Sequence, residues 1–225
     1  SKCAVVYGGV DVVHEFSPDD IDDEFKNRNS DIFKYERGVG LWLWKPYFIN
    51  RLLHELKDGE YIVYSDVGVG FIGKVNLLID VIQRDNVNMM FFGLPMLDVE
   101  WTKKEAFDIA GYNPKMSDRQ VDGSFFILKV SDEARNMVKE WFELCSNEKA
   151  LSPKVFDSTK KSYPSFVSHR EDQSLLSIVL HKRGVEYYRD PSDYGEFPFQ
   201  YKSNRWTYSP QLYINSQYPT IILHH

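Results

Sequence analysis

Short apolar runs bounded by glycine, aspartate or proline alternate along this chain with segments in which apolar residues recur every three or four positions. The runs predict buried strands at 3–9, 60–64, 89–93, 122–128 and 185–188. The helical spacing predicts intervening helices at 46–56, 75–82, 102–111, 131–145 and 170–183. Such alternation is typical of an α/β domain, so we expect a central, mostly parallel sheet with helices on both faces.

Local capping patterns predict where several of these helices begin. Ser131 precedes one helix, and Ser17 with Pro18 predicts a further helix start near the amino terminus. Two pairs match the capping box, in which a hydroxyl and a glutamate three residues later bind each other's backbone amides: Thr102 with Glu105, and Ser168 with Glu171. The polar segment 146–165 contains two prolines and predicts a surface loop.

Composition limits the class of protein. With 225 residues and 43% hydrophobic content, the chain is long enough for one domain with a substantial core. The net charge of -6 and the scattered basic residues argue against nucleic acid or an anionic membrane as partner. Two cysteines, Cys3 and Cys145, are too few for a disulfide framework, and no run predicts a membrane span. We therefore expect a cytoplasmic, reducing environment.

Asp66 is the most informative single residue. It follows the predicted strand 60–64 directly, and Gly68 and Gly70 come after it. Ligands of open α/β sheets bind at the carboxyl ends of strands, where glycines let the backbone approach a phosphate or sugar. A carboxylate there can hold a divalent cation that in turn holds a diphosphate. The alternative is a turn aspartate that binds its own backbone.

Two cations lie near a predicted helix start. Lys45 precedes Pro46, which suits a first helical turn, and Arg37 lies close in sequence. A helix amino terminus favours anions, so Arg37 and Lys45 predict a polyphosphate site. Between them, Trp42 and Trp44 are interpreted as packing residues in preference to ligand stackers.

Other candidate site residues lie near the two ends of the chain and in the late helix. Asp172, in the first turn of the helix 170–183, is either a dipole partner or a general base. The terminal His224 and His225 are either metal ligands or the remnant of an expression tag. The run 3–9 ends in glycines, as nucleotide-binding units do, but it lacks a dinucleotide fingerprint.

Aromatic residues crowd the segment 187–218. Rings with a polar tip suit a sugar, and packing over the sheet is the alternative. The residues concerned are Tyr187, Tyr188, Tyr194, Phe197, Phe199, Tyr201, Trp206, Tyr208, Tyr213 and Tyr218.

The order and spacing of several motifs resemble those of glycosyltransferases with the GT-A fold. Enzymes of this type are found in bacterial capsular polysaccharide clusters and in large DNA viruses of algae. They include amino-terminal domains of multidomain chlorovirus enzymes. The resemblance covers most of the chain. The motifs are the segment 37–46, Tyr64-Ser65-Asp66-Val67-Gly68, Trp101-Thr102-Lys103, Asp122-Gly123 and His169-Arg170-Glu171-Asp172-Gln173.

The resemblance implies one GT-A (Rossmann-like) domain over 1–225, with a donor-binding half at 1–95 and an acceptor half at 96–225. It implies transfer of a hexose or deoxyhexose from a nucleotide-diphosphate sugar, usually UDP-linked, to a glycan hydroxyl, with a manganese or magnesium ion. Inversion is the prediction, and a retaining reaction, which also places acids near the donor, stays open. A viral member would act in the host cytoplasm.

The resemblance places the Asp-x-Asp metal motif on Ser65-Asp66-Val67-Gly68 and the Glu-Asp pair that supplies the base on Glu171-Asp172. Together with the residue patterns it predicts Tyr7 and Gly8 near the nucleoside, Arg37 and Lys45 at the diphosphate, and Ser65 and Asp66 in contact with the donor. Asp66 and His224 would hold the metal, and Asp172 would be the base. The chain departs from the family's Asp-x-Asp metal motif, because Gly68 replaces the second aspartate, and this puts metal dependence in doubt.

Three other functions remain open from the residues. A sugar nucleotidyltransferase would share the α/β core, but a phosphate loop rich in glycine and lysine is missing after the first run. A non-catalytic glycan-binding domain would need the aromatic segment without Asp66 and Asp172 together. A glycoside hydrolase would leave Arg37 and Lys45 unexplained.

Overall fold

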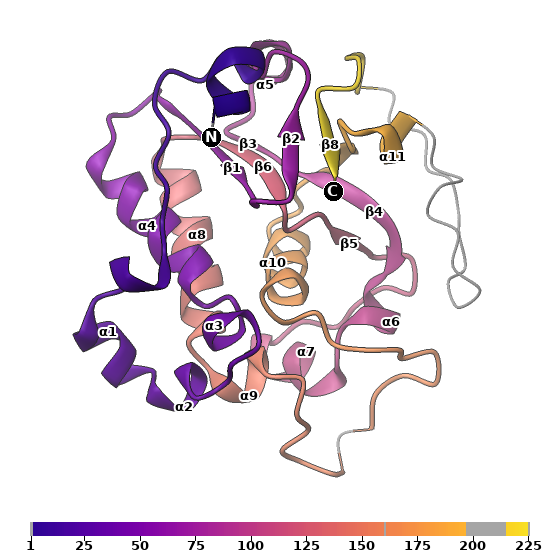
Figure 1. Cartoon of the computed structure of the whole chain (residues 1–225). Helices are drawn as coiled ribbons and strands as arrows, with labels where there is room; N and C mark the ends of the chain where they lie inside the picture. The colour runs from indigo at the N-terminus through magenta and orange to yellow at the C-terminus, as the bar shows by residue number, and fades with distance from the viewer. Residues whose placement is uncertain (1, 160, 197–214, 225) are drawn as a thin grey trace.

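The computed structural model describes residues 2–159, 161–196 and 215–224, and within them the chain is a mixed α/β protein (Figure 1). Its described strands form three small sheets. The first has the order β1-β6-β3, with β1 at Tyr61–Ser65, β6 at Phe125–Lys129 and β3 at Met89–Met90. The second has the order β5-β4-β7, with bounds Arg119–Val121, Phe92–Leu97 and Tyr188–Arg189. The third pairs β2 (Val69–Phe71) with β8 (Ile222–His224).

Strand direction differs from the expectation. Strand β6 runs antiparallel to both β1 and β3, with Tyr61 opposite Lys129 and Ser65 opposite Phe125. The pairs β4·β5 and β2·β8 are also antiparallel, and among the described strands only the β4·β7 ladder is parallel. The expectation of a mostly parallel sheet is therefore wrong. An apolar run such as 125–128 signals that a strand is buried on both faces, and neighbours of either direction provide that burial.

Helices cover both faces of the first sheet, as expected. Phe126 and Leu128 belong to a core formed with α4 (Trp44–Glu55), α8 (Asp132–Cys145) and α10 (Glu171–Lys182). Phe125 and Ile127 face the opposite core, which includes α5 (Asn76–Asp85) together with β2 and β8. Helices α4 and α8 pack side by side, and α8 also packs against α10 (Figure 1). The alternation along β6 thus separates two cores.

Several helix predictions are confirmed. The Ser131 hydroxyl accepts a hydrogen bond from the Ala134 amide and caps α8, and Trp141 and Cys145 are buried along this helix. Ser17 caps a short 3-10 helix, η2, at Pro18–Asp20. Helix α7 (Lys104–Ala110) ends at a left-handed Gly111. No helix in the described ranges is long and apolar enough to cross a membrane.

The first predicted strand is wrong. Ala4–Gly8 forms a π-helix, η1, in which Val5, Val6 and Tyr7 are about half exposed or more. A short apolar run has no periodicity that separates a strand from a helical turn, and this run does not enter a sheet. The remaining described elements are α1 (Asp23–Arg28), α2 (Ser30–Phe33), α3 (Gly38–Leu41), α6 (Asp98–Trp101), α9 (Glu148–Leu151, inside the predicted loop 146–165) and α11 (Asp193–Glu196).

Both predicted capping boxes are absent. Helix α7 has no side-chain cap, and the Glu105 carboxylate accepts hydrogen bonds from the amides of Phe156 and Asp157 instead. Helix α10 also lacks a side-chain cap, and the Glu171 carboxylate binds Arg37. In both cases a partner distant in sequence takes the glutamate that the local pattern assigned to the helix start.

Candidate functional site

Three residues singled out from the sequence meet in the fold. Asp66 follows β1, Lys45 lies in the first turn of α4, and Asp172 lies in the first turn of α10. The Lys45 ammonium is 3.0 Å from Asp172 Oδ2 and 3.6 Å from Asp66 Oδ1, and it donates to the Gly123 carbonyl at 2.9 Å. We call Lys45, Asp66 and Asp172 the lysine-bridged cluster.

Burial governs the charges of this cluster. The side chains of Lys45 and Asp172 are 4% and 6% exposed. Burial raises the pKa of Asp172 to about 6, against the opposing effect of the Lys45 charge. Burial alone would lower the pKa of Lys45, but Asp172, Tyr64 and Asp66 together hold it above its ordinary value. The result is a charged lysine beside a carboxylate whose pKa suits proton transfer near neutrality.

The environment of Lys45 differs from the expected polyphosphate site. Its ammonium is enclosed, and Asp172, Asp66 and the Gly123 carbonyl surround it. An ammonium has three donors, so a phosphate would have to displace one of these partners. In this arrangement Lys45 joins two carboxylates, a role that the helix-start pattern did not predict.

Before α4 the backbone forms a left-handed turn. All five residues 38–42 have positive φ, and Leu41 and Trp42 donate their amides to the carbonyls of Arg37 and Gly38 at 2.9 and 3.1 Å. Each non-glycine residue in this conformation costs roughly 1–2 kcal/mol, and such strain concentrates at functional sites. The turn leads directly into the helix that carries Lys45.

Arg37 connects this turn to α10. Its guanidinium lies over the Trp42 ring, 5.2 Å from the centroid, and binds Glu171 Oε1 at 2.8 Å. Glu171 is buried and itself has a positive φ of 43°. Arg37 remains 63% exposed, so of the two predicted phosphate ligands it is the one accessible to a ligand. Trp44 donates its indole N–H to the Gly38 carbonyl, in agreement with a packing role.

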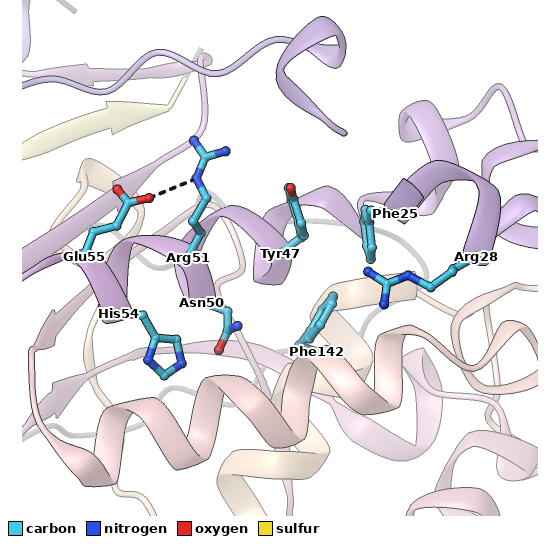
Figure 2. A pocket seen from close by; sticks show the side chains of 8 residues that line it. All are labelled: Phe25, Arg28, Tyr47, Asn50, Arg51, His54, Glu55 and Phe142. Atoms are coloured by element: carbon cyan, nitrogen blue, oxygen red, sulfur yellow. Dashed lines mark ion pairs between the residues drawn. The ribbon is translucent and has the colours of Figure 1, made fainter. Parts of the chain in front are cut away.

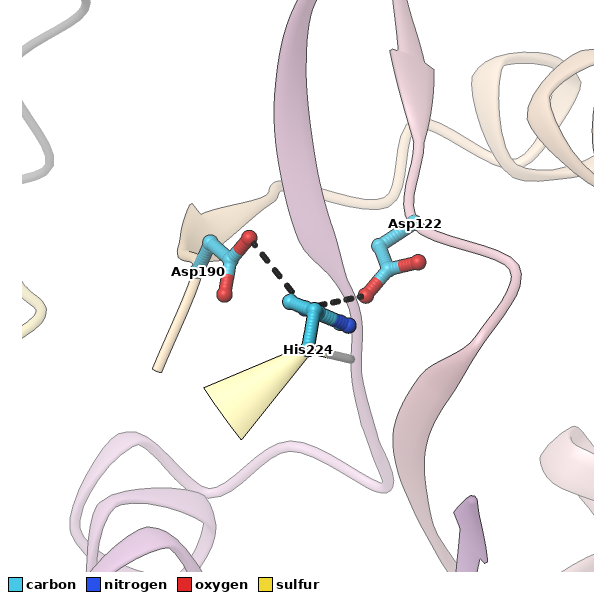
Figure 3. Close-up of side chains that lie close together, drawn as sticks. All are labelled: Asp122, Asp190 and His224. Atoms are coloured by element: carbon cyan, nitrogen blue, oxygen red, sulfur yellow. Dashed lines mark ion pairs between the residues drawn. The ribbon is translucent and has the colours of Figure 1, made fainter. Parts of the chain in front are cut away.

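A second cluster unites Asp122, Asp190 and His224 (Figure 3). His224 Nε2 is 3.8 Å from Asp122 Oδ2 and 3.8 Å from Asp190 Oδ2, and one ligand atom of each residue lies within 4.8 Å of the others. Both aspartates are buried, and His224 is 23% exposed. We call this group the aspartate–histidine cluster.

The two aspartates of this cluster are in different states. Asp122 Oδ1 accepts hydrogen bonds from the amide and hydroxyl of Ser124, whereas its buried Oδ2 has no hydrogen-bond partner. Burial and the charge of Asp190 raise the pKa of Asp122 to about 6. Burial also acts on Asp190, but the neighbouring His224 imidazole and the hydrogen bond from the Ser192 amide keep its pKa below the ordinary value. The Asp122 carboxylate is therefore the poorly compensated one.

One short segment connects the clusters. Asp122 belongs to the aspartate–histidine cluster, the next carbonyl, of Gly123, accepts from Lys45, and the Ser124 carbonyl accepts from the Asp66 amide at 2.8 Å. A Cβ atom on Gly123 would lie 3.2 Å from the Gln173 side chain on α10, so glycine permits this close approach. Residues 122–124 therefore connect the two clusters, which are neighbours in the fold.

The predicted metal pair of Asp66 and His224 is not brought together as one ligand group in the described residues. His224 lies with Asp122 and Asp190, while the Asp66 carboxylate contacts Lys45 and the Tyr64 hydroxyl. Sequence reasoning missed Asp190 and gave Asp122 no metal role. Both residues directly follow short strands, β5 and β7, as Asp66 follows β1, and that position was the signal that could have found them.

The other predicted contacts are placed as follows. Gly8 accepts a hydrogen bond from the Val75 amide at 2.9 Å and lies against Phe71, while Tyr7 is 57% exposed. Ser65 ends β1, and its hydroxyl donates to the Asp66 carbonyl. The nucleoside and donor roles of these residues stay predictions.

Part of the aromatic segment is described. Tyr188 and Tyr218 are buried, in agreement with packing, and the Tyr188 hydroxyl donates to Asp85. Outside the described residues lie His225 and the ring residues Phe197, Phe199, Tyr201, Trp206, Tyr208 and Tyr213.

A separate hollow of about 450 Å³ lies among α1, α4 and α8 (Figure 2). Arg51 and Glu55 form an ion pair of 3.5 Å on its rim. None of the residues of either cluster lines it. Its lining residues are Phe25, Arg28, Tyr47, Asn50, Arg51, His54, Glu55 and Phe142.

Comparison of the chain with protein-family models, with curated proteins and with solved structures finds no match in any of the three.

Proposed function

We propose that this chain is an inverting glycosyltransferase that moves a hexose or deoxyhexose from a nucleotide-diphosphate sugar to a glycan hydroxyl. The resemblance of the sequence motifs favours a UDP-linked donor. One observation carries the proposal: Lys45, Asp66 and Asp172, distant in sequence, meet at the end of β1 beside the aspartate–histidine cluster. Sugar transfer needs both a base for the acceptor and a neutralised leaving group, and these groups can supply them.

Asp172 is the proposed general base. Its pKa of about 6 allows the carboxylate to be ionised at neutral pH and still accept a proton from an attacking hydroxyl. Lys45 holds one carboxylate oxygen of Asp172 at 3.0 Å and so orients the side chain. Trp141 adds a hydrogen bond from its indole N–H to the Asp172 carbonyl, which fixes the backbone at the same point.

Arg37 is the proposed diphosphate ligand. Its guanidinium is exposed, and its contacts with Trp42 and Glu171 orient it. The unpartnered oxygen of Asp122, with His224 next to it, fits a divalent cation close to the lysine-bridged cluster. When bound, such a cation would supply charge neutralisation for the leaving diphosphate.

The test is UDP release from a panel of UDP-sugars, with and without Mn²⁺ and with oligosaccharide acceptors, together with calorimetric titration of each donor. We expect Asp172→Asn to bind donor within about threefold of the parent and to transfer roughly 100-fold to 10,000-fold more slowly, because it lacks the base. The matched control is Glu143→Gln, an exposed acid on α8, which should match the parent.

Two outcomes would contradict the proposal. Either no UDP-sugar binds the parent chain under any of these conditions, or Asp172→Asn transfers sugar at the parent's rate. Donor binding with no transfer by the parent to any acceptor would instead favour a glycan- or nucleotide-binding domain.

A further inference from the structure

We propose that Asp122, Asp190 and His224 form the divalent-cation site of this chain, with Mn²⁺ preferred over Mg²⁺ and Ca²⁺. The proposal goes beyond the proposed function, because a cation can bind these residues whether or not the chain transfers a sugar. It also differs from the metal ligands predicted from the sequence, which were Asp66 and His224. Asp122 and Asp190 take the place of Asp66, and the family motif includes neither of them.

The geometry of the three residues suits one ion. In an octahedral site with metal–ligand distances near 2.1 Å, adjacent ligand atoms lie about 3 Å apart and opposite ones about 4.2 Å. The distances of 3.8 Å from His224 Nε2 to Asp122 Oδ2 and to Asp190 Oδ2 lie between these values. Small side-chain rotations therefore bring all three ligand atoms to a common centre. Figure 3 shows the imidazole between the two carboxylates.

Asp122 provides the observation that separates this group from an ordinary acidic cluster. Its side chain is 8% exposed, and its Oδ2 atom, which faces His224, is buried without a hydrogen-bond partner. An ionised oxygen in that state is unfavourable, and native structures pair such atoms with a cation or a donor. Asp122 Oδ1 is already satisfied by Ser124, so the free oxygen is available to an ion.

Lys45, in the neighbouring cluster, forms no ion pair with this group in the described part of the chain. Lys45 donates to the Gly123 carbonyl, and its two ion pairs are with Asp66 and Asp172. Among the described residues, the group that forms an ion pair with Asp122 is His224, a side chain that can also bind a metal through its nitrogen when it is neutral. The three residues of the aspartate–histidine cluster are thus two buried carboxylates and one imidazole.

The ligand types indicate the ion. Carboxylate oxygens suit Mg²⁺, Ca²⁺ and Mn²⁺, while an imidazole nitrogen favours transition metals over Mg²⁺ and Ca²⁺. Two oxygens and one nitrogen at the distances seen here suit Mn²⁺, with its remaining positions open to water or a ligand.

The experiment measures Mn²⁺ alone, without nucleotide. The EDTA-treated and desalted chain is titrated with Mn²⁺, and the free ion is followed by its electron paramagnetic resonance signal. We expect one site in the parent, and affinities lowered on the order of 100-fold in Asp122→Asn and in His224→Gln, because each substitution removes a direct ligand. Asp66→Asn and the surface control His54→Gln should bind within about threefold of the parent.

Folding of each variant is checked by circular dichroism and urea unfolding without metal. Asn at 122 keeps the acceptor for Ser124, so this variant carries the test even if His224→Gln is unstable. Absence of a Mn²⁺ site in the parent would overturn the proposal, and so would an unchanged affinity in Asp122→Asn. Loss of binding in Asp66→Asn with retention in Asp122→Asn would move the site to the family position.

This readout is independent of sugar transfer. A Mn²⁺ site lost with Asp122, in a chain that transfers no sugar, supports the cation site and contradicts the proposed function. Sugar transfer by a chain that binds no Mn²⁺ supports the proposed function and contradicts the cation site.

Discussion

The lysine-bridged cluster and the aspartate–histidine cluster each hold two carboxylates, but they differ in what neutralises them. Lys45 is a permanent cation enclosed between Asp66 and Asp172. Between Asp122 and Asp190 lies the imidazole of His224, whose Nε2 is 3.8 Å from an oxygen of each carboxylate, against 3.0 Å between Lys45 and Asp172. The first cluster therefore contains a permanent cation of its own, and for the second we propose an added one.

Removing the built-in cation should have the largest effect. Lys45→Met keeps the apolar stem but leaves Asp172 buried without its partner, and breaking a buried ion pair in this way costs about 3–5 kcal/mol. Urea unfolding at pH 8 measures the loss. The control Lys104→Met, which breaks the more exposed pair with Asp108, should cost about 0.5 kcal/mol or less. Equal losses in the two variants would mean that burial of Lys45 is unimportant for stability.

The two buried aspartates should respond to amidation with opposite signs. Asp172→Asn leaves a buried lysine without its closest partner, which costs about 3–5 kcal/mol, but it also removes a carboxylate whose pKa burial raises to about 6. Because Asp66 still pairs with Lys45, the net result should be a loss of about 2 kcal/mol in the free energy of unfolding. Asp122→Asn removes a poorly compensated charge and should raise that free energy by about 1 to 2 kcal/mol at pH 8 without metal. Both changes are measured by urea unfolding in EDTA. If both variants lose stability, the proposed difference between the clusters is wrong.

The pH dependence of the unfolding free energy should show whether the raised pKa of Asp122 causes the effect of Asp122→Asn. The pKa of Asp122 is raised from 3.8 to about 6 in the folded chain. The folded protein binds the Asp122 proton more tightly than the unfolded chain does. The contribution of protonated Asp122 to the free energy of unfolding is therefore fully present below about pH 4 and is lost as pH rises through about 6. The difference in unfolding free energy between the parent and Asp122→Asn should therefore grow from pH 4 to 7 and then level off. A difference that stays constant over this range would contradict the raised pKa.

Asp66 should give the smallest effect on stability. Its side chain is 37% exposed and lies farther from Lys45 than Asp172 does, at 3.6 Å against 3.0 Å. Asp66→Asn should change the free energy of unfolding by less than about 1 kcal/mol, because solvent screens a partly exposed pair. A loss as large as that of Asp172→Asn, in the same urea experiment, would show that the two carboxylates share Lys45 equally.

Local sequence signals determined the positions of the key residues within their elements. Asp66 follows a strand because the apolar run 61–64 precedes it and glycines follow it. Lys45 and Asp172 lie in first helical turns that the helical spacing predicts. These features depend on a few neighbouring residues, and one sequence contains that information.

Pairing between distant segments was decided only by the tertiary structure. Strand direction, the enclosure of Lys45, and the binding of Glu105 and Glu171 to distant partners in place of their own helix starts all depend on which segments pack together. The meeting of Asp122 with Asp190 and His224 depends on the same packing. Burial and charge pairing are properties of the folded chain, because a side chain's solvent exposure and nearest charges are set by residues far away in sequence.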